Sequence, residues 1–222
     1  MKHVIAIDGP TGSGKSTVSR LVAKRLNYGY LDTGAMYRAV ALAIKRAGAG
    51  LQDEAAIATI CNGLDIRFVP RGEAPRVYLG DEDVSAAIRE PSMDMLASDA
   101  SALEVVRKAM TGLQRKIASQ GPLVAEGRDM GTVVFPDARH KFYLDASLEV
   151  RVDRRFKERQ SKGEHITRDE VEEDLIKRDQ QDMNRSLAPL KPAEDASIID
   201  TTELTLGQVV EAILKEIKNA KD

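Results

Sequence analysis

The sequence predicts an α/β fold in which helices cover both faces of a parallel sheet. Short apolar runs rich in β-branched residues, such as residues 3–7, alternate along the chain with longer segments of helical pattern. Continuous apolar runs of this kind are typical of strands that are buried on both faces. Strands separated by helices require right-handed crossovers, which make the strands parallel and place helices on either side of them.

The elements of this sheet can be read in order along the chain. The predicted strands are residues 3–7, 28–31, 122–125, 140–144 and 196–199. A helix is expected directly after the first strand, at Lys15–Leu26. The clearest helix lies near the C-terminus, where apolar residues recur at spacings of three and four and form one stripe. The stripe consists of Leu206, Val209, Val210, Ile213, Leu214 and Ile217.

Residues 64–80 break the alternation. Two short strands, Ile66–Val69 and Arg76–Leu79, flank a loop from Pro70 to Pro75 that is rich in proline, glycine and charge, which favours a hairpin. A helical pattern then resumes over residues 90–119. We expect one domain over residues 1–222, with an insertion at about residues 60–103, because no repeat or low-complexity linker indicates a second domain.

Composition argues against several functional classes. The chain is 42% hydrophobic, and 33 basic against 35 acidic side chains leave a net charge of −2. This balance argues against intrinsic disorder, nucleic-acid binding and binding to anionic membranes. The longest uncharged stretch, residues 55–64, is too short to span a bilayer, and Asp8 ends the first apolar run too early for a signal peptide. With Cys61 as its one cysteine, the chain has no internal disulfide, and we expect a cytoplasmic protein.

The strongest motif joins the first predicted strand to the first predicted helix. It matches G-x-x-x-x-G-K-[ST], the pattern of a phosphate-binding loop, in the strand–loop–helix context that this pattern requires. Glycines let backbone N–H groups turn towards phosphate oxygens, and the helix directs the positive end of its dipole at the same anions. We expect Lys15 to reach the β- and γ-phosphates and the Ser16 hydroxyl to bind Mg²⁺. The alternative, a chance match of a glycine-rich turn, does not explain why all these features coincide.

The phosphate loop indicates a nucleoside triphosphate but not the reaction. A GTPase should carry N-K-x-D for guanine and D-x-x-G for the γ-phosphate switch, and neither pattern occurs in this sequence. Nucleic-acid motors are usually longer and carry basic tracts, which are also missing. A small kinase is therefore the preferred class.

A second candidate anion site follows the second strand, where Asp32, Thr33 and Arg38 occur together. Ligands of open α/β sheets bind beyond the carboxyl ends of the strands, so this turn is expected to face the ligand. We expect Thr33 to cap the next helix, with Asp32 and Arg38 near it. The alternative is an ordinary capped turn with a surface arginine.

A third candidate site ends the third core strand, where Glu126, Arg128 and Asp129 occur together with the glycines at positions 127 and 131. Three charged groups beside a buried strand reduce stability unless they are solvated or paired. A functional site explains them better than a plain loop does.

Arg178, Asp182 and Arg185 form a fourth candidate group. Their spacing of i, i+4 and i+7 places them on one face of a predicted helix. The surrounding residues 151–185 contain ten basic and ten acidic side chains, so a salt-bridged, solvated helix pair is one interpretation. The other is a mobile lid whose arginines close over phosphates and exclude water.

Taken together, these segments resemble the bacterial cytidylate kinases (CMP/dCMP kinases) of the nucleoside-monophosphate kinase group of P-loop proteins. The resemblance covers essentially the whole chain. It rests on the phosphate loop, on L-D-T-G-A-M-Y-R at residues 31–38, on G-R-D-M-G-T-V-V-F-P at residues 127–136, and on K-R-D at residues 177–179. It implies a P-loop NTPase core with a five-stranded parallel sheet flanked by helices, a monophosphate-binding insertion at about residues 60–103 and a helical lid at about residues 148–166.

The resemblance also implies the activity and the residues that carry it. The γ-phosphoryl group of ATP would pass to CMP or dCMP, giving ADP and CDP or dCDP, with Mg²⁺ as cofactor. ATP would be bound by Gly9, Pro10, Thr11, Gly12, Ser13, Gly14, Lys15, Ser16 and Thr17. CMP would be bound by Thr33, Arg38, Ser98, Arg107, Arg128, Asp129, Arg178, Asp182 and Arg185. Within this set Ser98, Arg107 and Asp129 would contact cytosine, and Asp182 and Arg185 would reach the sugar.

Lys15, Arg128 and Arg178 are the candidate catalytic residues, since they would neutralise charge on the transferred phosphoryl group. Glu126 either holds a magnesium-bound water or is a structural carboxylate. Two alternatives to cytidylate kinase remain: a kinase for another small acceptor such as UMP, and a regulatory P-loop ATPase that binds a protein partner. We expect ATP and CMP or dCMP as the partners of a monomer.

Overall fold

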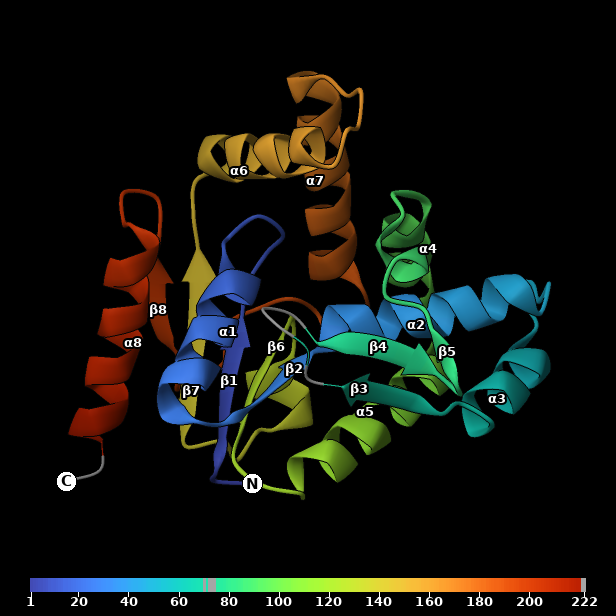
Figure 1. Ribbon diagram of the computed structural model, residues 1–222, viewed down its shortest axis with the longest axis horizontal. Helices are drawn as coiled ribbons and strands as arrows, with labels where there is room; N and C mark the ends of the chain where they lie inside the picture. Colours follow the sequence, from blue (N-terminus) through green and yellow to red (C-terminus); the bar gives the residue numbers. More distant parts are fainter. Residues whose placement is uncertain (70, 72–74, 221–222) are drawn as a thin grey trace. The chain divides into compact units, whose positions relative to one another are not determined.

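The computed structural model describes residues 1–69, 71 and 75–220, and it contains the parallel sheet that the sequence predicts (Figure 1). Five strands form this sheet in the order β2-β6-β1-β7-β8. Their bounds are Val4–Asp8 (β1), Gly29–Asp32 (β2), Leu123–Gly127 (β6), His140–Asp145 (β7) and Ser197–Asp200 (β8). β1 pairs in parallel with β6 and β7, and β7 pairs in parallel with β8, which confirms the predicted α/β fold.

The strands end one or two residues later than the apolar pattern predicts. Asp8 pairs with Gly127 of β6 and with Tyr143 of β7, so β1 continues through its first charged residue. The prediction was wrong here because a hydropathy pattern ends a buried strand at the first charge, whereas backbone pairing continues to the edge of the sheet. As a result two carboxylates, Asp8 and Glu126, are only 4% and 3% exposed.

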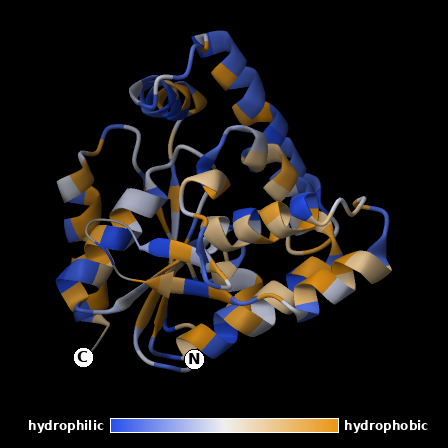
Figure 2. Cartoon of the chain, turned by 45° about the vertical axis from the view of Figure 1, so that its right-hand side comes forward, coloured by the Kyte–Doolittle hydropathy of each residue, from blue (hydrophilic) through white to orange (hydrophobic). Residues whose placement is uncertain are grey.

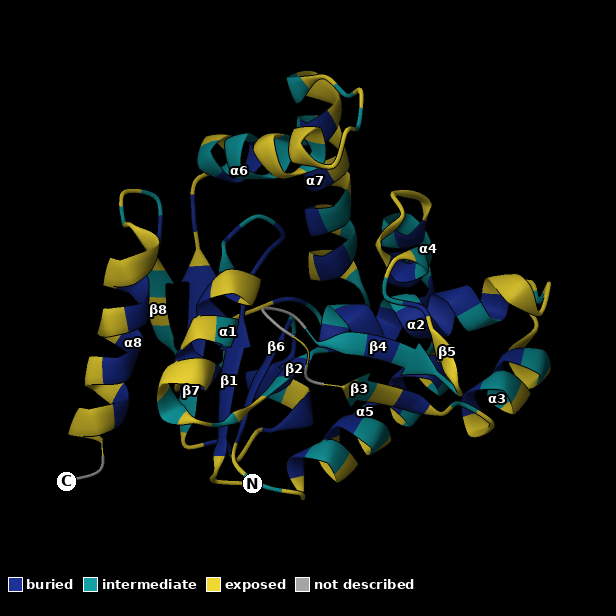
Figure 3. Ribbon diagram, in the orientation of Figure 1, coloured by how far each residue is buried: buried dark blue, intermediate teal, exposed yellow. Residues whose placement is uncertain are grey.

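The parallel sheet belongs to a compact unit formed by residues 1–31 and 118–222. Its helices are α1 (Lys15–Leu26), α6 (Leu148–Ser161), α7 (Arg168–Asn184) and α8 (Leu206–Asn219), with a π-helical turn, η2, at Met130–Val134. α1, α8 and the strands share one apolar cluster, which includes Ile5, Val22 and Ile213. The predicted stripe of α8 is buried apart from Leu206, at the first position of the helix. Figure 3 shows β1 buried along its length and α8 exposed on its outer face.

The second compact unit is formed by residues 32–117. Its elements are α2 (Thr33–Arg46), α3 (Glu54–Asn62), β3 (Ile66–Val69), β4 (Arg76–Leu79), β5 (Glu82–Asp83), a 3₁₀ turn η1 (Ala87–Arg89), α4 (Ser92–Ala102) and α5 (Glu104–Ala118). β3 and β4 pair antiparallel, as predicted, and β5 adds a third short strand. Residues 70 and 72–74 of the predicted hairpin loop lie outside the described residues. The insertion expected at about residues 60–103 remains a prediction.

The helical pattern over residues 90–119 is divided into two helices rather than one. Leu103, between α4 and α5, has an extended backbone with ψ of 129°. The Ser101 hydroxyl donates to the Ser98 carbonyl, and Arg107 donates to the Ser101 carbonyl. Serine side chains compete with the backbone for hydrogen bonds, and the arginine satisfies a carbonyl at the end of α4, so the chain can turn there.

Hydropathy follows the layers of the fold. In Figure 2 the strands of the parallel sheet are largely hydrophobic, whereas the helices carry hydrophilic residues along one side. No helix in the part of the chain that the structure describes is both long and apolar enough to cross a membrane.

Candidate functional site

The phosphate loop leaves β1 at Gly9 and ends where α1 begins. Gly12 and Gly14 have φ angles of 82° and 86°, in the left-handed region that favours glycine. A Cβ atom on Gly12 would lie 2.9 Å from Cβ of Arg151, so there is also no room for a side chain at this position. The loop therefore has the backbone that the motif requires, and the positive end of the α1 dipole lies directly beside it.

Lys15, the first residue of α1, lies buried against this loop. Its Nζ donates to the backbone oxygen of Pro10 at 2.9 Å. Burial lowers the pKa of Lys15 from 10.5 to about 7, and the neighbouring guanidinium groups of Arg128 and Arg178 act in the same direction. An anion bound among these three cations would raise this pKa again, so the cluster favours a phosphate.

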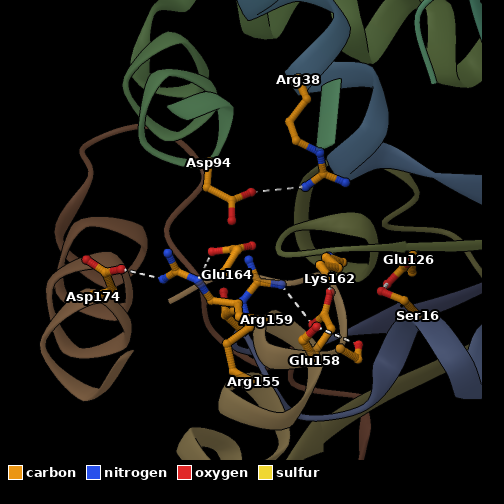
Figure 4. Close-up of polar contacts among 12 residues, drawn as sticks. Ser16, Arg38, Asp94, Glu126, Arg155, Glu158, Arg159, Lys162, Glu164 and Asp174 are labelled. Carbon is orange, nitrogen blue, oxygen red and sulfur yellow. Dashed lines mark hydrogen bonds and ion pairs between the residues drawn. The ribbon is translucent and has the colours of Figure 1, made fainter. Parts of the chain in front are cut away.

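A buried carboxylate lies beside the first turn of α1. Ser16 Oγ donates to Glu126 Oε2 at 2.7 Å (Figure 4), and Tyr30 Oη donates to Glu126 Oε1 at 2.6 Å. The described residues contain no group of three or more His, Cys, Asp or Glu side chains that could hold a metal ion. A magnesium ion carried on nucleotide phosphates needs only one or two protein oxygens. Ser16 and Glu126 supply hard oxygen ligands of that kind, so they fit the ion.

Arg128 connects the turn after β6 with α7 and with the phosphate loop. Its Nε donates to Asp182 Oδ2 at 2.8 Å, and its Nη2 donates to Thr11 Oγ1 at 2.7 Å. Burial opposes ionisation of Asp182, yet Arg128, Arg178 and Arg185 hold the pKa of this carboxyl below its ordinary value. The structure thus brings together three of the segments that the sequence marked separately.

The predicted helical face is only partly correct. Arg178 and Asp182 lie on α7, but Arg185 lies just beyond it, with ψ of 140°. Its Nε donates to the Ala188 carbonyl at 2.6 Å, and its Nη1 lies 3.6 Å from Asp182 Oδ1. Arg185 therefore stays beside Asp182 through the turn that follows α7 and not through helical periodicity.

The turn after β2 begins α2, and its cap differs from the prediction. Asp32, not Thr33, is the N-cap, and its Oδ1 accepts from the backbone N–H of Ala35 at 2.8 Å. A carboxylate at this position also interacts favourably with the helix dipole, which explains the preference. Thr33 is the first residue of α2.

Arg38 of α2 is the candidate phosphate ligand of the second unit. Its Nη1 lies 3.6 Å from Asp94 Oδ1 of α4 (Figure 4). Its Nε is buried and has no hydrogen-bond partner among the described residues. A buried guanidinium N–H of this kind favours an additional anion.

Ser98 and Arg107, the expected cytosine ligands of the second unit, are both buried. The guanidinium of Arg107 lies 5.7 Å from the centre of the Tyr37 ring, within the range of a cation–π contact. The predicted CMP ligands divide between the units. Arg128, Asp129, Arg178, Asp182 and Arg185 belong to the first unit, and Thr33, Arg38, Ser98 and Arg107 belong to the second.

Comparison with known proteins decides which P-loop family this is. A family model described as cytidylate kinase matches residues 5–219. The cytidylate kinase of Geobacter sp. (strain M21) is 49% identical over 215 residues, which are 97% of this chain and 92% of that protein. The cytidylate kinase of Carboxydothermus hydrogenoformans is 45% identical over 218 residues, which are 98% of both. The chain belongs to the cytidylate kinase family.

Membership of this family makes the chain a nucleoside-monophosphate kinase that phosphorylates CMP with ATP, as the resemblance implied. A crystal structure of an uncharacterised protein from Eubacterium ventriosum matches 97% of this chain at a TM-score of 0.54 and 12% identity. The match covers 98% of the Eubacterium ventriosum protein. At this low identity it shows that the two chains share a fold, and it says nothing about activity.

Three residues near the family's phosphate loop were missed by the sequence analysis. Tyr30 contacts Glu126, and Asp8 accepts hydrogen bonds from the turn after β6. Arg151 of α6 donates to the Thr11 carbonyl at 3.2 Å and pairs with Asp179 of α7. Only Asp8 has a signal in the sequence, a charge at the end of an apolar run. In the sequence Tyr30 resembles an ordinary aromatic residue of a core strand, and Arg151 is not distinguished from the many other charged residues of its segment.

Proposed function

We propose that this chain transfers the γ-phosphoryl group of ATP to CMP or dCMP with Mg²⁺, using the residues assigned below. The observation that carries the proposal is the cluster of Lys15, Arg128 and Arg178 beside the phosphate loop, in which the two arginines perturb the pKa of the lysine. The transferred phosphoryl group and its neighbours carry several negative charges, so fixed cations stabilise the transition state without a covalent intermediate.

ATP occupies the phosphate loop, where Gly9, Pro10, Thr11, Gly12, Ser13, Gly14, Lys15, Ser16 and Thr17 contact its phosphates. The left-handed backbone at Gly12 and Gly14 and the start of α1 support this assignment. When bound, Mg²⁺ neutralises phosphate charge and orients the transferred group. The Ser16 hydroxyl would hold it, and Glu126, already within 2.7 Å of that hydroxyl, would act through a water.

Nine residues are assigned to the acceptor, five of them in the first unit and four in the second. Arg38, Arg128 and Arg178 bind phosphate oxygens, which the unsatisfied Nε of Arg38 supports. Asp182 and Arg185 reach the sugar, and Thr33 contributes its hydroxyl. Ser98, Arg107 and Asp129 recognise cytosine, since a buried carboxylate can accept from the N4 amino group. The attacking atom is a phosphate oxygen that is already anionic, so the residues need to position it rather than deprotonate it.

The region around residues 148–166 acts as the lid. α6 and α7 pack through a small apolar cluster of Val152, Val171 and Leu175. Arg159 joins them, because its Nε donates to Glu164 at 2.6 Å and its Nη1 to Asp174 at 2.8 Å (Figure 4). A pair of helices linked in this way can move as one body over bound phosphates and exclude water.

A coupled assay of ADP formation tests the function, with ATP and Mg²⁺ against CMP, dCMP, UMP, AMP and no acceptor. We expect turnover with CMP and dCMP, at most weak turnover with UMP, and loss of activity when EDTA removes the metal. Preference for UMP would indicate a kinase for another acceptor, and equal turnover without acceptor would indicate an ATPase; either result contradicts the proposal.

Two arginine variants test the residue assignments in the same assay. Arg178→Gln should reduce kcat by about a hundredfold, since it removes a charge that acts on the transferred group. Arg25→Gln is the matched control, because Arg25 is 62% exposed and pairs with Glu211 on the surface of the same unit. Sedimentation should show the monomer that we propose, and the enzyme would act in the cytoplasm.

A further inference from the structure

Asp8, the last residue of β1, is a buried carboxylate to which the phosphoryl-transfer scheme gives no role. Its Oδ1 accepts from the backbone N–H of Met130 at 2.9 Å, and its Oδ2 accepts from that of Gly131 at 2.8 Å. Met130 and Gly131 are the first two residues of η2. The first N–H groups of any helix have no partner within the helix, so Asp8 supplies the acceptors that they need.

The position of Asp8 connects two parts of the active site. It is followed directly by Gly9 of the phosphate loop, and it pairs across the sheet with Gly127 of β6. Arg128 and Asp129 lie between Gly127 and the two N–H groups that Asp8 holds. Asp8 thus lies at both ends of the short segment that presents Arg128 and Asp129, because its backbone pairs with Gly127 and its carboxylate holds Met130 and Gly131.

The turn around η2 leaves little freedom to adjust if this anchor is lost. Backbone bonds from Val133 to Asp129 at 2.9 Å and from Phe135 to Met130 at 2.7 Å close it. A Cβ on Gly131 would lie 3.2 Å from Cδ of Lys141 and 3.5 Å from Oδ2 of Asp8. The turn therefore packs directly against the carboxylate, and displacement of one displaces the other.

Several charged or titratable groups face Asp8. Burial raises its pKa to about 7, its two backbone hydrogen bonds lower it, Asp129 raises it and Arg128 lowers it. Tyr143 of β7 lies close enough that Asp8 contributes to raising the tyrosine pKa. The protonated carboxyl has one oxygen that is a donor, so it accepts less well from the two N–H groups. The anchor is consequently weakened as the pH falls through neutrality.

We propose that Asp8 is a positioning residue for the acceptor nucleotide, which holds Arg128 and Asp129 at the geometry that CMP requires relative to the phosphate loop. This inference rests on the proposed CMP-binding role of these two residues. It differs from a merely structural role for Asp8, because it ties the ionisation of Asp8 to recognition of CMP and leaves binding of ATP unaffected.

Asp8→Asn tests this directly, because asparagine keeps the size of the side chain but has one acceptor oxygen in place of two. We expect KM for CMP to rise by about tenfold or more at pH 8, the effect of losing one hydrogen bond to a charged group, while KM for ATP stays within about twofold. The ratio of KM for CMP at pH 6 to that at pH 8 should be larger in the wild-type enzyme than in Asp8→Asn. The phosphate of CMP itself titrates near pH 6 in both enzymes, so the comparison cancels it.

Two further variants keep the result unambiguous. Asp53→Asn, at the exposed N-cap of α3, makes the same chemical change and should alter neither KM nor the pH ratio. Gly131→Ala disturbs the turn without changing Asp8, and it should raise KM for CMP even if Asp8→Asn does not fold. An unchanged KM for CMP in folded Asp8→Asn or in Gly131→Ala overturns the proposal. The proposal is also overturned if Asp8→Asn raises KM for CMP and KM for ATP equally and keeps the wild-type ratio of KM for CMP at pH 6 to that at pH 8. If Asp129→Ala leaves KM for CMP unchanged, the proposed CMP-binding role of Asp129 has failed instead, and a wild-type enzyme that does not phosphorylate CMP would contradict the proposed function itself.

Discussion

Replacing Lys15 by methionine should strongly slow phosphoryl transfer and at the same time stabilise the protein without ligand. Lys15 is 8% exposed and lies beside Arg128 and Arg178, so its charge is unfavourable until phosphate binds. Methionine has a similar length and no charge. We expect kcat to fall by roughly a hundredfold to a thousandfold, the effect of removing one group that stabilises transition-state charge.

The size of the stability change follows from the pKa of Lys15, which falls from 10.5 to about 7 because the side chain is buried. Between about pH 7 and pH 10.5 the folded protein binds fewer protons than the unfolded chain, so the free energy of unfolding increases with pH. Each pH unit corresponds to about 1.4 kcal/mol, so burial of Lys15 lowers the free energy of unfolding by roughly 5 kcal/mol below pH 7, where the lysine stays charged, and by roughly 2 kcal/mol at pH 9, where it loses its proton on folding. The lost hydrogen bond to Pro10 offsets about 1 kcal/mol of the gain.

Urea unfolding, followed by far-ultraviolet circular dichroism because the chain has no tryptophan, should be measured at pH 6 and pH 9. The advantage of Lys15→Met over the wild type should be about 3 kcal/mol larger at pH 6 than at pH 9. Lys24→Met, an exposed position on the same helix, should show no such pH dependence. An advantage that does not change with pH, or a variant that is less stable at pH 6 than the wild type, would refute the reasoning.

Three other substitutions have expected outcomes that steady-state kinetics can measure. Asp129→Ala should lower kcat/KM for CMP sharply and kcat/KM for UMP little, because a carboxylate that accepts from cytosine N4 repels the O4 of uracil. If the ratio of kcat/KM for CMP to kcat/KM for UMP does not change, the assignment of Asp129 to cytosine is wrong. Arg185→Ala should raise KM for CMP by about tenfold and leave KM for ATP nearly constant. If only KM for ATP rises, Arg185 binds ATP and its assignment to CMP is wrong. Tyr30→Phe removes the hydrogen bond to Glu126 and should raise the Mg²⁺ concentration needed for half-maximal ATP binding, whereas Tyr28→Phe, two residues earlier in the chain, should not.

Much of this architecture is local enough to be predicted. The five strands, the phosphate loop and the stripe of α8 each follow from the spacing of residues that are neighbours in the chain. The predictions that failed depend on short-range side-chain hydrogen bonds at the ends of helices, which residue spacing alone does not reveal. Leu103 divides one helical pattern into two helices, and Arg185 leaves the helix that its spacing implied. Asp32 displaces Thr33 as the cap because its carboxylate reaches the Ala35 N–H in the folded turn.

The sequence by itself determined the class of the fold, the nucleotide loop and the three charged segments that carry the other candidate site residues, because each is a pattern of residue types at short spacing. Tertiary structure alone decided which of these charges meet. Lys15, Arg128 and Arg178 form one electrostatic cluster although more than a hundred residues separate the first from the others. Asp8 and Tyr30 acquire their partners only when β1, β2 and β6 lie in the same sheet. Hydrogen bonds and charge interactions act over a few ångströms of space, and no periodicity along the chain encodes that proximity.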